Sequence, residues 1–164
     1  MAKTIYTFGD DISTDIIYPG RYMATVLPNE TPQYAFDDIK ELNKMLVSGE
    51  VPQGSVIVAG KNFGTGSSRE QAVSTLKGHE LVIIAKSFAR IFYQNSVNLG
   101  LRIIICPDIE ADKGDEIEFT DNKVINKTKG KEFDIIPHSK TRQEIIDAGG
   151  LIAYTRKRLL TKQK

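Results

Sequence analysis

Three short apolar runs, separated by helical patterns, constrain the fold of this chain most strongly. They lie at residues 54–60, 81–85 and 101–106. The middle run is apolar at every position, which is typical of a strand buried on both faces of a sheet. Between the runs, apolar residues recur at helical spacing over about 68–77 and 88–99. This alternation of strands and helices predicts an α/β fold built around a layered sheet.

The remaining segments extend this mixed architecture. Residues 3–8 alternate and predict another strand, and a helix is expected over 33–46. From 112 to 137, glycine and asparagine turn signals separate short alternating segments, a pattern that indicates hairpins. A last helix is expected to begin near Thr141. We therefore predict a single domain over 1–164, a mixed layered sheet with flanking helices.

Charge and cysteine content exclude several classes of function. The chain has 22 basic and 21 acidic residues, a formal net charge of +1, so it offers no field that would attract nucleic acid or a membrane surface. No apolar stretch approaches the roughly 20 residues of a membrane span, and the first residues lack the layout of a secretory signal. The one cysteine, Cys106, ends an apolar run and is expected in a buried strand. We expect a cytoplasmic protein that binds no metal by itself.

The segment 61–72, KNFGTGSSREQA, is the strongest candidate for a functional loop. It connects a buried strand to a helix, so rigid elements would hold it at the edge of the sheet. Gly64 and Gly66 permit backbone angles and close approaches that other residues forbid. Asn62 belongs to the same loop.

Two adjacent serines end this loop. Ser67 is followed three positions later by Glu70, which fits a capping box. The pattern places Ser67 and Ser68 at a helix N-terminus, where free amides and the helix dipole favour an anion. Arg69 adds a guanidinium that matches a carboxylate. The alternative is a well-capped helix after a tight turn, with no functional role.

A second loop, 9–15, carries Asp10, Asp11 and Asp15. The spacing of these carboxylates does not match a calcium loop, which requires a glycine and a distal glutamate. We instead expect Asp15 to hydrogen-bond to the backbone or to an arginine and to fix the segment that follows. That segment, 21–32, has no clear period and is expected to be a loop.

Neither of two familiar motifs is present. The chain has no phosphate-binding lysine followed by serine or threonine at a helix start, and Gly66-Ser67-Ser68-Arg69-Glu70 lacks the final glycine of a hydrolase elbow. A serine hydrolase would also need a histidine base. Both histidines, His79 and His138, are expected at the surface.

Three segments in order, 9–19, 62–72 and 86–92, resemble the swivel domain of the aconitase/isopropylmalate isomerase family. Together they extend from residue 9 to residue 92, about half of the 164-residue chain. The resemblance implies a swivelling β/β/α domain that acts as the small subunit of a hydro-lyase. Its partner would be a large subunit carrying a [4Fe–4S] cluster, in a heterodimer or heterotetramer.

The resemblance also implies roles for individual residues. Ser68 would be the base that takes a proton from the carbon next to the hydroxyl-bearing carbon, Ser67 would support it, and Arg69 would hold a substrate carboxylate. Supporting roles in the loops would fall to Asp15, Asn62, Gly64, Gly66 and Glu70. Gln71 departs from the histidine of many relatives, and we expect little consequence.

In this family the loop containing Met23, Ala24 and Thr25 reads the variable group of the substrate. An arginine at position 24 would suit a third carboxylate, whereas Ala24 beside Met23 favours an aliphatic group. The expected reaction is therefore the dehydration and rehydration of 2-isopropylmalate in leucine biosynthesis. Arg21 is near enough to swing in, so a homoaconitate-type substrate stays open, as do 2,3-dimethylmalate and citramalate. A small-anion-binding module without catalysis is the alternative from another class.

Overall fold

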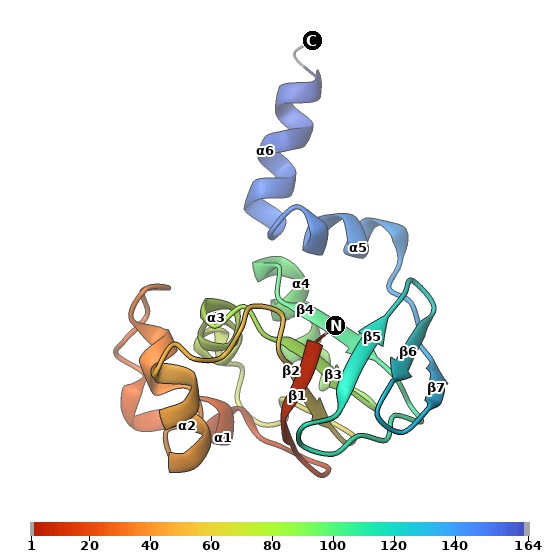
Figure 1. Cartoon of the computed structure of the whole chain (residues 1–164). Helices are drawn as coiled ribbons and strands as arrows, with labels where there is room; N and C mark the ends of the chain where they lie inside the picture. Colours follow the sequence, from red (N-terminus) through yellow and green to blue (C-terminus); the bar gives the residue numbers. More distant parts are fainter. Residues whose placement is uncertain (1, 163–164) are drawn as a thin grey trace.

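The computed structural model describes residues 2–162 and contains a seven-stranded sheet in the order β4-β3-β2-β1-β5-β6-β7 (Figure 1). The pairs β1–β2, β2–β3 and β3–β4 are parallel, and the remaining pairs are antiparallel. The strands are β1 (Ala2–Thr7), β2 (Val56–Ala59), β3 (Val82–Ala85), β4 (Arg102–Ile105), β5 (Glu116–Phe119), β6 (Lys123–Asn126) and β7 (Lys131–Asp134).

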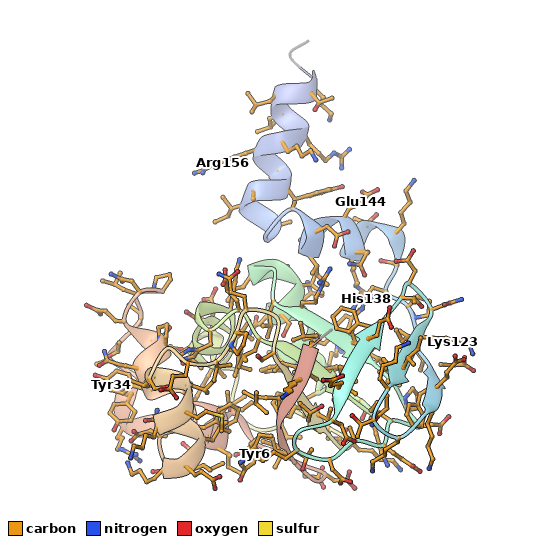
Figure 2. All side chains as sticks on the ribbon, in the orientation of Figure 1. Tyr6, Tyr34, Lys123, His138, Glu144 and Arg156 are labelled. Atoms are coloured by element: carbon orange, nitrogen blue, oxygen red, sulfur yellow. The ribbon has the colours of Figure 1, made fainter. Side chains whose placement is uncertain are left out.

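The helices divide into a group around the sheet and a projecting C-terminal helix. They are α1 (Thr14–Ile17), α2 (Lys40–Val47), α3 (Glu70–Gly78), α4 (Arg90–Leu99), α5 (Lys140–Asp147) and α6 (Leu151–Lys162), with 3-10 turns η1 (Gly20–Tyr22) and η2 (Thr31–Tyr34). Helix α6 extends away from the rest of the chain (Figure 1), and Arg156 on it points outward (Figure 2). Within residues 2–162, no helix has the length and apolar character needed to cross a membrane.

Two apolar layers explain why β2 and β3 are buried at every position. One face of the parallel strands packs against the helices, through residues that include Ile57, Ile83, Leu42, Leu76 and Phe92. The other face packs against the antiparallel strands, through residues that include Val58, Ile84, Ile117 and Val124. The N–H of Ile136 donates to the carbonyl of Ile105 (2.8 Å), so the chain after β7 returns to β4. The predicted mixed, layered sheet with flanking helices is confirmed.

The prediction of a helix over 33–46 is wrong for the first half of that segment. That part forms η2 and a loop, and only α2 is a regular helix. Phe36 adopts a left-handed backbone (φ 51°), which ends any helix there. Its N–H donates instead to the carbonyl of Ile17 (2.8 Å), and its side chain is fully buried. Long-range packing of one aromatic residue therefore overrides the local periodicity.

Cys106 is fully buried, as its apolar surroundings predict. It follows β4 directly, and its thiol donates to the carbonyl of Asp134 (3.4 Å). Burial raises the pKa of this thiol to about 11. At neutral pH the sulfur is therefore protonated and poorly suited to bind a metal.

Candidate active site

A groove of about 1000 Å³ lies where the carboxyl ends of the four parallel strands meet. Open parallel sheets commonly bind ligands at this edge, because the loops after neighbouring strands converge there. The lining residues include Thr14 after β1, Gly66, Ser67, Ser68 and Arg69 after β2, Ala89 and Arg90 after β3, and Ile105 at the end of β4. The topology therefore brings the three sequence segments of the resemblance to one place.

The acidic loop after β1 is tied to the glycine-rich loop after β2. Four backbone hydrogen bonds of 2.7 to 3.2 Å join them. In addition, the Asp10 carboxylate accepts from the N–H of Lys61 (2.7 Å), and the Asp11 carboxylate accepts from the side chain of Asn62 (3.1 Å). These two carboxylates therefore fix the start of the glycine-rich loop to the loop after β1.

Asp15 bonds both to the backbone and to an arginine, as predicted. One of its oxygens accepts from the N–H of Gly20 (2.8 Å) and from Nη1 of Arg69 (2.7 Å). The hydrogen bond from Arg69, followed by that from Gly20, lowers the pKa of the Asp15 carboxyl below its usual range. Nη1 of Arg69 also donates to the carbonyl of Tyr18 (3.1 Å), and only 16% of the arginine side chain is exposed. The guanidinium is thus held in one orientation, with its other donors available.

The predicted capping box does not form. Helix α3 begins at Glu70, its N-cap is Arg69 in an extended conformation, and no side chain caps it. The reason is a distant contact: Thr14 Oγ1 donates to the carbonyl of Ser67 (2.8 Å), which keeps the serines in the loop. Both Ser67 and Ser68 are exposed in the groove, and Ser68 directly precedes the N-cap.

The backbone of the glycine-rich loop packs closely against α4. Gly64 has φ +89°, and a Cβ at this position would lie 2.2 Å from Cγ of Phe92, whereas a Cβ at Gly66 (φ +92°) would meet ordinary contacts at 3.7 Å. Asn62 is also left-handed (φ 57°), and its N–H donates to Oγ of Ser87 (2.9 Å). Ser87 therefore holds the loop and does not cap α4, whose N-cap is Ala89.

The segment expected to read the substrate forms a tight turn, residues 22–25, hereafter the 22–25 turn. The carbonyl of Tyr22 accepts from the N–H of Thr25 (2.9 Å), so Met23 and Ala24 occupy its exposed tip. Nε2 of Gln71 in α3 donates to the Met23 carbonyl (3.2 Å). The turn does not line the groove itself, but this contact anchors it to the first turn of the helix that follows the serines.

Arg21 does not reach toward the serines in this structure. Its guanidinium pairs with Asp37 and Asp38 (both 2.6 Å) and lies over the ring of Tyr22 (4.8 Å from its centroid). The positive charge of Arg21 is therefore paired with these two carboxylates, and it does not take the place of an arginine at position 24.

Comparison with known proteins identifies the family. Residues 24–107 match the aconitase C-terminal domain. The 3-isopropylmalate dehydratase small subunit of Methanosarcina mazei is 42% identical over 161 residues, which cover 96% of this chain and 97% of that protein. The chain belongs to the 3-isopropylmalate dehydratase small-subunit family. The corresponding subunit of Thermodesulfovibrio yellowstonii is likewise 42% identical, over 94% of this chain and 93% of its own length.

The solved structures agree with this membership in the dehydratase family. A crystal structure of 3-isopropylmalate dehydratase from Methanocaldococcus jannaschii superposes with a TM-score of 0.88 at 40% identity, over 98% of this chain and 96% of that chain. The predicted aconitase-type swivel fold is confirmed, as is membership in a family of hydro-lyase subunits.

The far wall of the groove in this dehydratase-family chain was not predicted from the sequence. It includes His138 and Arg142, which follow β7. Nε2 of His138 faces the carbonyl of Ile103 (2.8 Å) and must donate to it, and in the neutral imidazole Nδ1 then accepts from the hydroxyl of Tyr93 (2.6 Å). His138 is therefore a partly buried link beneath α5 (Figure 2) and not the surface residue that was expected.

His79 was also expected at the surface and is likewise partly buried, with Nε2 bonded to the carbonyl of Pro32 (2.7 Å). Only the return of the chain to β4 reveals the far wall of the groove, and no local pattern signals it.

Proposed function

We propose that this chain is the small subunit of a cytoplasmic hydro-lyase that isomerises 2-isopropylmalate to 3-isopropylmalate in leucine biosynthesis. The observation that carries the proposal is the exposed Ser68 beside the oriented Arg69, in a groove at the carboxyl edge of the parallel strands. Relatives that share about 42% identity and bear the name of this dehydratase support the choice of substrate.

In the proposed reaction, Oγ of Ser68 takes a proton from the carbon next to the hydroxyl-bearing carbon, and the hydroxyl leaves to give an alkene. Arg69 holds a carboxylate of the substrate with the donors that Asp15 and Tyr18 leave available, and Ser67 supports the adjacent hydroxyl. Water then adds to the alkene so that the hydroxyl is placed on the neighbouring carbon, which isomerises the hydroxy acid.

A serine hydroxyl is a weak base in open water, so the groove must be closed during the reaction. The positive end of α3 and the Arg69 charge each stabilise the deprotonated serine by about 1–2 kcal/mol when partly buried. The groove is open on this chain, and Ile91 and Ile136 in its wall are 53% and 52% exposed. We propose that the large subunit covers this face and excludes water, in a heterodimer or heterotetramer.

The iron–sulfur cluster belongs to that large subunit in this proposal. Such clusters are held by several cysteine thiolates, whereas this chain has Cys106 as its single cysteine, and that thiol is buried and protonated. When bound in the partner, the cluster supplies Lewis-acid assistance to the departing hydroxyl.

Reconstitution with a cluster-bearing large subunit tests the proposed function. We expect 2-isopropylmalate to be converted to the alkene only when both chains are present. The absorbance of the alkene measures this reaction. If the mixture stays inactive while this chain alone binds malate-like anions, the chain is a non-catalytic anion-binding module. Covalent labelling of the isolated chain by a phosphonylating probe would instead indicate a serine hydrolase.

The substitution Ala24→Arg is expected to shift substrate preference towards tricarboxylates. The new guanidinium would stand at the exposed tip of the 22–25 turn and could pair with a third carboxylate. We expect the ratio of kcat/KM for homocitrate over 2-isopropylmalate to rise about 10- to 100-fold, the value of one hydrogen bond to a charged group. Steady-state kinetics with both substrates measure this ratio.

Val26→Arg is the matched control, because Val26 is 62% exposed and lies just outside the turn. It adds the same charge two residues away and should leave the ratio unchanged. An equal shift in both variants would mean that net charge, and not the tip of the turn, governs the preference.

A further inference from the structure

Tyr18 joins the two parts of the proposed site through its two polar groups. Its carbonyl accepts from Nη1 of Arg69 (3.1 Å). Its hydroxyl donates to the carbonyls of Tyr22 (3.0 Å) and Thr25 (3.2 Å), the first and last residues of the 22–25 turn. The residue that helps to orient the carboxylate-binding arginine is therefore also the residue that holds the turn.

The Tyr18 hydroxyl holds the two ends of the 22–25 turn together. A phenol has a single proton, so it is shared between the two carbonyls, and both must stay within about 3 Å of one oxygen atom. The ring cannot shift to relax the contact, because the Tyr18 side chain is fully buried. The rings of Tyr22 and Tyr34 pack edge-on against it, with centroids 6.3 and 6.2 Å away.

We propose that Tyr18 is a positioning residue for substrate selection. Through its hydroxyl it fixes Met23 and Ala24 at the tip of the turn relative to Arg69, so that the variable group and a carboxylate of one substrate are read together. The proposal rests on the proposed function, in which these residues contact the substrate. It assigns to Tyr18 no part in the chemical step.

Tyr18→Phe removes the hydroxyl and keeps the buried ring. Tyr34→Phe is the matched control, since Tyr34 packs against both Tyr18 and Tyr22 and its hydroxyl makes no hydrogen bond in the described residues 2–162. With the large subunit present, we expect Tyr18→Phe to reduce the preference for 2-isopropylmalate over homocitrate about tenfold, mainly through KM, as the loss of one hydrogen bond implies. Tyr34→Phe should change this preference less than twofold.

Hydrogen exchange provides a second readout that does not depend on activity. In the free chain, the hydrogen-bonded amides of Met23 and Thr25 should exchange about tenfold faster in Tyr18→Phe than in Tyr34→Phe, while exchange in β2 and β3 stays equal in both. Faster exchange across the whole chain would show that the hydroxyl serves stability alone, and this result would overturn the proposal.

The outcomes separate this proposal from the proposed function. If Ala24→Arg shifts the preference but Tyr18→Phe behaves like Tyr34→Phe, Tyr18 has no positioning role and the function of the turn stands. If Ala24→Arg has no effect, the turn does not read the substrate, and neither its role in selection nor the positioning role of Tyr18 stands; reconstitution with the large subunit still tests the hydro-lyase function by itself. A reduced preference in Tyr18→Phe, with faster exchange confined to the turn, supports the proposal.

Discussion

Replacing Ser68 with alanine is expected to lower kcat of the complete enzyme by roughly 10³- to 10⁴-fold, the usual contribution of a positioned general base. Arg69 would still hold the substrate carboxylate, so KM should change little. Ser68 is exposed and its side chain makes no hydrogen bond within residues 2–162. The free energy of unfolding should therefore stay within about 0.5 kcal/mol of the wild-type value. Steady-state kinetics with the large subunit and urea denaturation of the free chain measure the two quantities.

Ser67→Ala is the control, because it removes a hydroxyl that is also exposed, one residue away. Its backbone carbonyl, which binds Thr14, is retained. We expect a much smaller loss, of about tenfold, since Ser67 only supports its neighbour in the proposed reaction. Unchanged turnover in Ser68→Ala would remove this serine from its role, and equal losses in both variants would reassign the base to the pair.

The substitution Gly64→Ala is expected to lower the free energy of unfolding by about 3 kcal/mol or more, through a steric clash combined with an unfavourable backbone angle. The added methyl group would lie 2.2 Å from Cγ and 2.5 Å from Cβ of Phe92. These atoms lie close to the backbone of α4, so a rotamer change cannot remove the clash. Urea denaturation followed by circular dichroism measures the loss.

Gly114→Ala separates the two causes. Gly114 has nearly the same backbone angle (φ +95°, against +89° at Gly64), but nothing lies within 4 Å of its missing Cβ. The Gly114→Ala variant should lose only about 1 kcal/mol of the free energy of unfolding. If the two variants lose equal stability, the contact with Phe92 costs nothing and the loop is less closely packed than the structure shows.

The elements of the fold could be predicted because each is local. The apolar runs of β2, β3 and β4, and the turn signals around β5 to β7, reflect burial and turn chemistry that neighbouring residues determine. Gly100 ends α4 with φ +75°, as a glycine after a periodic segment predicts. The failures came where a distant contact competes with a local pattern, as at Phe36, which bonds to Ile17, and at Ser67, whose carbonyl binds Thr14.

The same distinction applies to the site. The glycine-rich loop and the pairing of Asp15 with an arginine follow from residue types and spacing. The roles of Thr14 and Tyr18 could not be predicted, because each acts through a backbone carbonyl that no side-chain pattern reveals. The far wall around His138 depends on how the antiparallel strands return to β4, which is a property of the whole topology.

The contacts that hold the 22–25 turn have an evolutionary consequence. Tyr18, Gln71 and the N–H of Thr25 all bind main-chain oxygens, so none of these hydrogen bonds depends on which side chains stand at positions 23 and 24. Natural variation can therefore exchange both tip residues while the scaffold beneath them keeps its shape. If the turn selects the substrate as proposed, one or two codon changes at positions 23 and 24 would alter the acid that is accepted while the serine loop stays unchanged.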